Sequence, residues 1–225
     1  MRTLVVSDLH FGQPGRFRSA NKELFKLIHR DKWDRLVLLG DVFDLWHYDY
    51  CDIVEQNKDI LLEIDVLPYE VIYIPGNHDA EFKGMRRLNN MRVAAQPYNY
   101  SDGGKSIVLA HGNEFDTFSG TASKMASWVA VTADKVACYF MGPGTSIQRK
   151  VRHSFAAMNG KEKYAEPIAD RAMENLLGDI VVLGHTHIPE VREYKGRMYL
   201  NSGSFGPEGL TYVKIVDGNP ELCYI

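Results

Sequence analysis

Short runs of apolar, largely β-branched residues recur along the chain, and polar segments separate them. The runs are TLVVSD (3–8), RLVLLGD (35–41), EVIYIPGN (70–77), SIVLAH (106–111) and DIVVLGH (179–185). They are continuous rather than alternating, which is typical of strands that are covered on both faces. Helical patterns near 19–31 and 52–66 separate the first three runs. This βαβαβ order predicts an α/β fold with a sheet that is at least partly parallel.

The C-terminal third has a different pattern. The segments EVREYKGRMYL and TYVKIVDGNPELCYI predict strand pairs that turn at Lys195-Gly196 and Asp217-Gly218. The segment PYNYSDGGKSIVLA predicts a further hairpin. We therefore expect a second sheet that is more antiparallel than the first.

A long insertion, about 119–177, interrupts the strands and predicts two or three helices, broken at 142–144 and near Asn159-Gly160. It is long for a connection, and long connections often carry function. The first helix has one apolar side, made by Met125, Trp128, Val129, Thr132, Val136, Tyr139 and Phe140. A basic group follows it, made by Arg149, Lys150, Arg152 and His153. Two interpretations stay open: a helical subdomain that packs its own core, or a cap over a site for an apolar, phosphate-bearing substrate.

Composition narrows the class of protein. The 225 residues fit one domain, and the net charge of -3 argues against a general nucleic-acid binder. Cys51, Cys138 and Cys223 are far apart and predict reduced, mostly buried thiols rather than disulfides or a metal site. We see no signal peptide and no apolar stretch of ~20 residues, so we expect a cytoplasmic protein. The apolar helix near 121–141 leaves a peripheral contact with the inner face of a membrane as an alternative to packing within the fold.

Each of the five apolar runs ends in side chains that can bind a metal ion. They are Asp8 and His10, then Asp41 and Asp44, then Asn77, His78 and Asp79, then His111, and finally His185 and His187. In open α/β sheets, ligand sites gather beyond the carboxyl ends of the strands, so five separate segments can converge on one crevice. A single D-x-H or H-x-H motif carries little information, but five such endings in one chain form a strong joint signal.

The residue types indicate two metal ions that act on phosphorus. Carboxylate, amide and imidazole ligands without thiolate suit Mn, Fe or Zn rather than a structural zinc. Two ions that lie ~4 Å apart and share a carboxylate can bind the attacking and leaving oxygens of an in-line displacement at phosphorus. They also lower the pKa of bound water, so that metal-bound hydroxide exists near neutral pH. The sequence therefore predicts a metal-dependent hydrolase of phosphoric ester or pyrophosphate bonds.

Together these motifs resemble the calcineurin-like metallophosphoesterases. The family pattern D-x-H, G-D-x-x-D, G-N-H-[DE], H-G and G-H-T-H occurs as Asp8-Leu9-His10, Gly40-Asp41-Val42-Phe43-Asp44, Gly76-Asn77-His78-Asp79, His111-Gly112 and Gly184-His185-Thr186-His187. The resemblance runs from Asp8 to His187. It implies a four-layer α/β/β/α sandwich formed by a single domain, 1–225, that includes a helical cap insertion at 119–177.

The resemblance also implies roles for individual residues. Asp8, His10 and His187 would hold one metal, Asn77, His111 and His185 the other, and Asp41 would bridge them. His78 would bind the phosphate together with Asn77, stabilise its charge and help to protonate the leaving oxygen, while Asp44 orients His78. Asp79 is expected to be a hydrogen-bond acceptor that steadies the loop, and His47 is a candidate to flank the site. We expect two Mn²⁺ ions, with Fe or Zn as alternatives.

The segment GDVFDLWHYDY, the insertion and GHTHIP look like the UDP-2,3-diacylglucosamine hydrolase branch of the family. Enzymes of that branch cut a pyrophosphate in lipid A biosynthesis and release UMP and a lipid monosaccharide phosphate. The insertion would then cap the acyl chains, with basic residues of 149–163 near the phosphates. That branch typically has arginine at the position of His78, and NSGSFG (201–206) is closer to the general family.

Other functions therefore stay open. One is a phosphodiesterase or phosphatase that acts on a soluble, nucleotide-type phosphoester. Another, from a different class, is a non-catalytic binding protein on the same fold. We expect a small-molecule phosphoester or pyrophosphate partner, lipid-linked in the first case, and no nucleic acid.

Overall fold

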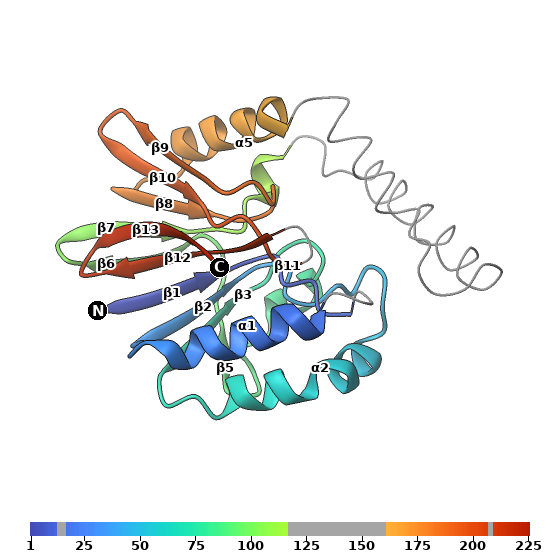
Figure 1. The fold of residues 1–225 in the computed structure, drawn as a ribbon. Helices are drawn as coiled ribbons and strands as arrows, with labels where there is room; N and C mark the ends of the chain where they lie inside the picture. The colour runs from blue at the N-terminus through green and yellow to red at the C-terminus, as the bar shows by residue number, and fades with distance from the viewer. Residues whose placement is uncertain (13–16, 117–160, 207–208) are drawn as a thin grey trace.

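The computed structural model describes residues 1–12, 17–116, 161–206 and 209–225, and Figure 1 shows two stacked sheets with helices on their outer faces. The first sheet has the order β11-β12-β1-β2-β3-β5-β4, and β13 pairs with β12. Its strands are β1 (Arg2–Val6), β2 (Arg35–Leu39), β3 (Glu70–Ile74), β4 (Arg87–Leu88), β5 (Met91–Val93), β11 (Phe205–Gly206), β12 (Gly209–Val216) and β13 (Asn219–Tyr224). The second sheet has the order β6-β7-β8-β10-β9. Its strands are β6 (Tyr98–Asp102), β7 (Lys105–Leu109), β8 (Ile180–Leu183), β9 (Glu190–Tyr194) and β10 (Arg197–Asn201).

The predicted parallel core is confirmed. Strand β1 pairs in parallel with β2, β2 with β3, and β3 with β5. The connecting helices are α1 (Phe17–Arg30) and α2 (Tyr50–Asp65), close to the predicted ranges. Because these connections are helical crossovers, the carboxyl ends of the first three strands meet at one edge of the sheet.

Three apolar layers explain why the strand sequences are continuous rather than alternating. On one face of the first sheet, Leu36 and Tyr73 belong to the cluster that includes Leu24 and Ile28 of α1. On the other face, alternate residues such as Val37, Ile72 and Ile74 face the second sheet. There they join the cluster that includes Ile107, Leu109, Val182 and Leu200. Both faces of each central strand are therefore buried.

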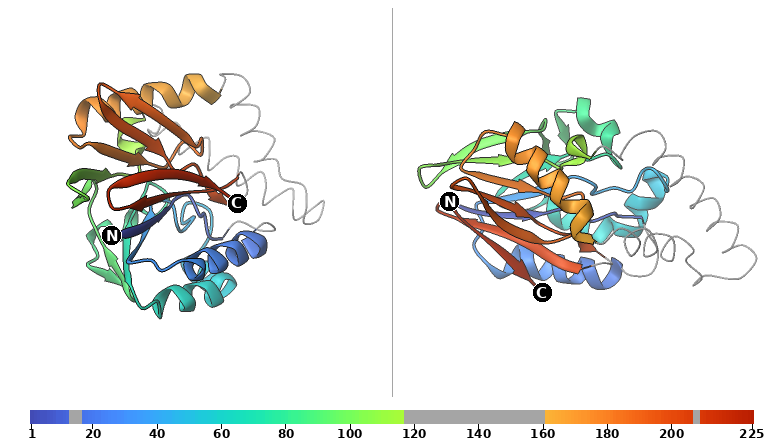
Figure 2. Two further views of the ribbon diagram at one scale, coloured as in Figure 1. Left: turned by 60° about the vertical axis from the view of Figure 1, so that its left-hand side comes forward. Right: turned by 90° about the horizontal axis from the view of Figure 1, so that it is seen from above.

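The third apolar layer lies under α5 (Lys161–Asn175), which covers the outer face of the second sheet (Figure 2). Ala169, Ala172 and Met173 pack there against Val181 and Tyr199. The four-layer α/β/β/α sandwich is therefore confirmed. Helix α5 is the C-terminal part of the predicted insertion, and it forms one of these layers. The remainder, with the amphipathic helix and the basic group, lies outside the described residues, so the cap stays a prediction.

The expectation that the second sheet is more antiparallel than the first is wrong, because both sheets are mixed. The predicted hairpins β6–β7 and β9–β10 are present, but β8 pairs in parallel with both β7 and β10. The reason is that α5 precedes β8, so the chain re-enters the sheet by a helical crossover. The predicted hairpin β12–β13 joins the first sheet, where β12 runs antiparallel to β1.

The structure can also be compared with two expectations from composition, the buried cysteines and the absence of a membrane-spanning helix. Cys51 and Cys223 are free, but Cys51 is exposed, so the expectation of a buried thiol is wrong there. Cys51 lies in the first turn of α2, where the neighbouring buried position is Ile53. Within the described residues, no helix combines the length and the apolar character that crossing a membrane requires.

Candidate metal centre

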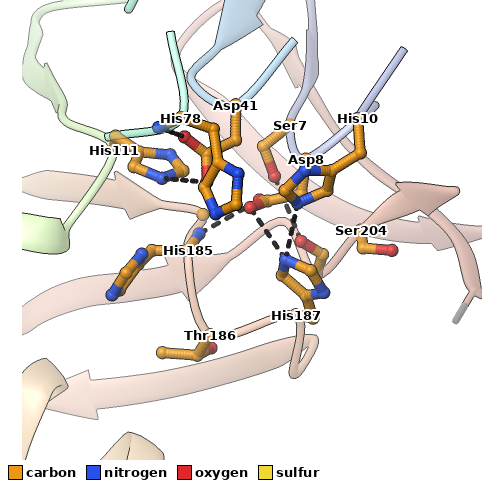
Figure 3. A network of polar contacts seen from close by, with 12 residues as sticks. Ser7, Asp8, His10, Asp41, His78, His111, His185, Thr186, His187 and Ser204 are labelled. Carbon is orange, nitrogen blue, oxygen red and sulfur yellow. Dashed lines mark hydrogen bonds and ion pairs between the residues drawn. The ribbon is translucent and has the colours of Figure 1, made fainter. Parts of the chain in front are cut away.

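The residues that follow β1, β2, β3, β7 and β8 come together at one edge of the sandwich (Figure 3). Backbone hydrogen bonds join the loops: the amide of Asp8 donates to the carbonyl of Gly40 at 3.1 Å, and the amide of Gly184 donates to that of His111 at 3.0 Å. A third link crosses between the sheets, because the amide of His185 donates to Asp8 Oδ2 at 3.0 Å. The predicted convergence of five strand ends is therefore present.

Asp8, His10 and His187 form the first group of ligand atoms. His187 Nε2 lies 3.1 Å from Asp8 Oδ1 and 3.2 Å from His10 Nε2. Asp8 and His10 are buried, and His187 is partly buried. A carboxylate oxygen and two ring nitrogens thus face one small volume, as ligands of one cation do.

Asp41, His111 and His185 form the second group. His111 Nε2 lies 3.2 Å from Asp41 Oδ2, and its Nδ1 lies 3.1 Å from the carbonyl oxygen of Leu39. A carbonyl only accepts, so this hydrogen bond places a proton on Nδ1 and directs Nε2 to the centre. Asp41 also has a ligand atom within 4.8 Å of those of His10 and His78, so it lies between the two groups.

Asn77 comes to the same place on the loop after β3. A side chain on Gly76, the residue before it, would contact Asp41 Oδ1 at 2.3 Å and His111 Cδ2 at 2.8 Å, so the loops touch here. The side-chain oxygen of Asn77 is buried and has no hydrogen-bond partner among the described residues. An unsatisfied buried acceptor costs about 1–3 kcal/mol, and a bound cation would remove that cost.

The buried acceptors fit divalent cations. Asp8 Oδ1 and His111 Nε2 lie within 3.1 and 3.2 Å of their charged neighbours, yet neither has hydrogen-bond geometry with a described residue. Close approach outside hydrogen-bond geometry is the arrangement expected of ligands around a common ion. The donor set of carboxylates, imidazoles and an amide agrees with this.

The electrostatics keep the carboxylates charged. Burial alone would raise the pKa of Asp8, but the charge of His187 and its contact lower it to about 2. Burial likewise opposes ionisation of Asp41, and His111 and His78 together hold the pKa of Asp41 well below its usual value. Burial, aided by the charge of His78, lowers the pKa of His10 to about 3, which leaves that imidazole neutral and able to bind a cation.

The backbone at the site is strained. Among the described residues, eight other than glycine have positive φ, and five of them are predicted ligands: Asp8, His10, Asp41, His185 and His187, with φ between 46° and 68°. Such values are uncommon for residues with a Cβ, and they concentrate where function imposes a conformation. Sequence patterns of polarity carry no signal for this strain.

His78 and Asp44 lie beside the two groups. His78 Nδ1 is 2.7 Å from Asp44 Oδ1, and His78 Nε2 is 3.9 Å from Asp41 Oδ2. The backbone amide of His78 donates to Asp41 Oδ1 at 2.8 Å. The predicted pair is therefore formed, and the other ring nitrogen of His78, Nε2, faces the centre. The ring of Trp46 stacks on His78 with centroids 4.0 Å apart.

Asp79 accepts hydrogen bonds from two loops. Its Oδ1 accepts from the amide of Gly76 at 2.6 Å, and its Oδ2 accepts from the amides of Val42 at 2.7 Å and Phe43 at 3.2 Å. The expectation of a hydrogen-bond acceptor that steadies the loop is confirmed. The contacts with Val42 and Phe43 add that Asp79 ties the loop after β3 to the loop after β2.

The structure adds residues that the motifs did not reveal. Asp116 Oδ2 lies 3.1 Å from His185 Nε2, and Asp116 follows His111 by five positions in the same strand-exit segment. Asn201 donates to the carbonyl of Gly184 at 2.7 Å and accepts from the amide of Gly203 at 2.9 Å. Asp116 could have been sought as an acidic residue close to a strand exit, whereas the role of Asn201 depends on the pairing of β10 with β8.

Comparison with known proteins agrees with this geometry. The family of calcineurin-like phosphoesterases matches residues 1–189. A DNA polymerase II small subunit from Pyrococcus furiosus is 23% identical over 90% of this chain, which spans only 37% of that protein. A UDP-2,3-diacylglucosamine hydrolase from Shewanella pealeana is 25% identical over 86% of this chain and 85% of its own length.

Solved structures share the fold. An archaeal phosphodiesterase superposes with a TM-score of 0.54 at 12% identity, covering 100% of both chains. The phosphoesterase Yfce from E. coli superposes with a TM-score of 0.51 at 18% identity, covering 96% of this chain and 89% of its own. The family match extends over all five strand exits that carry the site. The chain therefore belongs to the calcineurin-like phosphoesterase family.

Proposed function

We propose that the chain hydrolyses a phosphodiester or pyrophosphate with two divalent cations. Asp8, His10 and His187 would hold one cation, Asn77, His111 and His185 the other, and Asp41 would bridge them. One observation carries this proposal: two largely buried groups of ligand atoms lie side by side, and Asp41 is within 4.8 Å of members of both.

When bound, two cations would supply Lewis acidity toward the phosphoester and lower the pKa of a nucleophilic water. The protein supplies the remaining functions. The contact of His78 Nδ1 with Asp44 orients the ring so that Nε2 faces the centre. From there His78 would stabilise charge on the phosphate and donate a proton to the leaving oxygen. Asn77 would contact the same phosphate. The buried carboxylates hold the negative charge that balances the cations.

The candidate substrate is UDP-2,3-diacylglucosamine, cut at its pyrophosphate. The relative from Shewanella pealeana supports this candidate because the alignment covers most of both proteins. The presence of His78, where that branch typically has arginine, favours the second candidate, a soluble nucleotide-type phosphodiester. Mn²⁺ is our first choice of metal, with Fe or Zn as alternatives.

The polymerase relatives motivate a further arm of the test. The chain spans less than half of the length of these subunits. Whether it shares their assembly or substrate must therefore be decided by experiment. Single-stranded DNA therefore belongs among the substrates, although we propose a small molecule.

The test is a hydrolysis panel with protein reconstituted in turn with Mn²⁺, Fe²⁺ and Zn²⁺. The substrates are UDP-2,3-diacylglucosamine, nucleoside diphosphate sugars, cyclic nucleotides, an artificial phosphodiester, an artificial phosphomonoester and a DNA oligonucleotide. We expect metal-dependent release of UMP from the lipid substrate. Turnover of a soluble substrate alone would end the lipid proposal, and full metal content without any turnover would overturn the catalytic proposal.

A further inference from the structure

A second imidazole contacts the carboxylate that orients His78. His47 Nδ1 lies 2.7 Å from Asp44 Oδ1 without hydrogen-bond geometry, and His78 Nδ1 forms a hydrogen bond of 2.7 Å with the same oxygen. The Asp44 side chain is 0% exposed, and that of His47 is 2% exposed. The family motifs account for Asp44 and His78 but give no task to His47.

The local chain fixes His47 relative to Asp44. The backbone amides of His47 and Tyr48 both donate to the carbonyl of Asp44, at 3.2 and 3.1 Å. This turn folds the side chain of His47 back onto the carboxylate three residues before it. The turn that places His47 is thus held by backbone hydrogen bonds of its own.

A buried carboxylate needs hydrogen bonds or favourable charges close by to stay charged. For Asp44, burial opposes ionisation, and the contacts with His47 and His78 hold its pKa well below the usual value. With His47 removed, His78 would be left as the imidazole contact of that oxygen, and the carboxylate would be freer to rotate. His47 thus has a physical reason to be where it is.

The same turn also surrounds the ring of His78. Trp46 stacks on that ring with an interplanar angle of 21°, and the rings of His47 and His78 meet at 62° with centroids 5.5 Å apart. Together with Asp44, these two side chains restrain the imidazole, and Nε2 is the nitrogen that faces Asp41. The orientation of His78 is therefore set by residues of one short segment, 44–47.

We propose that His47 is a positioning residue for His78 and acts through the shared carboxylate of Asp44. His47 fixes the carboxylate, and the carboxylate then holds the proton on Nδ1 of His78 so that Nε2 can exchange a proton with the substrate. This inference rests on the role of His78 in the proposed function. It deepens that role by adding a third residue to the predicted pair.

Two substitutions separate a polar nitrogen beside the Asp44 carboxylate from its absence. In His47→Asn the side-chain amide nitrogen takes the place of Nδ1, whereas His47→Leu fills a similar volume without a polar atom. We expect His47→Leu to lower kcat about tenfold or more, as outer-shell positioning residues do. The KM and the content of two metal ions per chain should be unchanged, and His47→Asn should recover most of the rate.

A double-mutant cycle tests the path of the effect. If His47 acts only through His78, then His47→Leu should cause no further loss of kcat in a His78→Ala background. An equal loss in both backgrounds would overturn the proposal. So would a third metal ion in the wild type that is lost in His47→Leu, because Asp44, His47 and His78 would then be ligands of their own cation.

A spectroscopic measurement does not need turnover. In ¹H–¹⁵N spectra of histidine rings, recorded on the Zn-loaded protein, His47→Leu should shift the ring-nitrogen resonances of His78. His47→Asn should leave them near the wild-type positions. Unmoved His78 resonances in His47→Leu would contradict the proposal even if no substrate is known. An inactive wild type whose His78 resonances still shift in His47→Leu would contradict only the proposed function. If His47→Leu does not fold, His47→Gln replaces it in both measurements. The longer side chain of Gln carries its amide past the Nδ1 position, so the contact with Asp44 is lost.

Discussion

Histidines that look alike in the sequence differ in what their ring nitrogens face. His10 points Nε2 at His187, and burial keeps its imidazole neutral. His111 Nδ1 is hydrogen-bonded to a backbone carbonyl, and its Nε2 faces Asp41. His78 Nδ1 is hydrogen-bonded to a carboxylate rather than to a backbone carbonyl. These contacts, rather than the residue type, separate a proposed ligand from a proposed proton donor.

Asp41 is the residue whose loss should affect the whole centre. Asp41→Ala removes the carboxylate that contacts His111 and lies between the two groups of ligand atoms, so we expect it to abolish both metal loading and hydrolysis. Metal content by elemental analysis and turnover of an artificial phosphodiester measure this. Asp59→Ala, which removes an exposed carboxylate on α2, is the control. Full activity with intact metal content in Asp41→Ala would refute the assignment.

His78 should separate metal binding from catalysis. Its Nδ1 is committed to Asp44, so His78→Ala should keep both metal ions. Loss of a general acid should lower kcat ~10²-fold or more. Elemental analysis and steady-state kinetics on one preparation measure both quantities. A variant that lost metal in parallel with its activity would instead identify His78 as a ligand.

Asp116 should affect the affinity for metal rather than the chemical step. Its carboxylate contacts His185 Nε2, and outer partners of metal-binding histidines contribute roughly 10- to 100-fold to affinity. We therefore expect Asp116→Asn to weaken metal binding by about that factor in a competition titration with a chelator. Glu114→Gln removes the same charge from an exposed position two residues earlier and serves as the control. Equal affinities in the two variants would exclude a role for the Asp116 contact.

At the scale of the elements, the site depends on loops that approach each other more closely than side chains normally allow. A Cβ on Gly40 would lie 2.2 Å from His111 Nδ1, and one on Gly184 would lie 2.7 Å from Asp8 Oδ2. Asp79 holds two of these loops together through three backbone amides. The strand ends are therefore a single packed unit and not independent turns.

Gly76 offers the sharpest test of this packing. In Gly76→Ala the new methyl group would meet Asp41 Oδ1 at 2.3 Å and the Asp41 amide nitrogen at 2.7 Å, so the loop must shift. We expect overpacking to cost about 1–3 kcal/mol of the free energy of unfolding and to weaken metal binding. Thermal unfolding and metal titration measure these effects. Gly84→Ala is the matched control, because a Cβ there meets nothing within 4 Å.

The elements and the site differed in how far they could be predicted. Strands such as β2 were evident because both faces are buried, which makes the run continuous. The candidate ligands stand out in the sequence because they follow strand exits. The parallel pairing of β8, the contact of Asp116 with His185 and the positive φ of Asp41 were not predicted. Each of these depends on which distant segments pack together, and local polarity does not encode that.

At the scale of the molecule, the proposed metal centre joins the two sheets. In each proposed set, the first sheet supplies residues after β1 or β3, and the second sheet supplies residues after β7 or β8. One cation would connect Asp8 and His10 to His187, and the other would connect Asn77 to His111 and His185. Because the sheets pack on each other chiefly through the apolar layer between them, metal ions would act as cross-links at one edge of the sandwich.

Metal binding should therefore stabilise the whole molecule, and increasingly so as the pH rises. Burial lowers the pKa of His111, but the charge and contact of Asp41, together with the charges of Asp8 and Asp79, outweigh this and raise the pKa to about 10 from an ordinary value of 6.5. In the metal-free protein, the stability that this proton contributes is fully present below pH 6.5 and is lost as the pH rises toward 10. Binding a cation requires neutral Nε2, so it releases the proton, and affinity rises with pH.

The expected result is a gap in Tm between metal-loaded and metal-free protein that widens from pH 6 to pH 9. At a metal concentration of 100 times Kd, the stabilisation is about 2.7 kcal/mol per site, and each released proton adds about 1.4 kcal/mol per pH unit while metal is in excess. Thermal unfolding with and without chelator measures the gap, and calorimetry in buffers of different ionisation enthalpy counts the protons. A gap in Tm that stayed constant or narrowed over this range would show that His111 carries no proton in the metal-free protein. The contact between His111 and Asp41 would then be one between a carboxylate and a neutral imidazole.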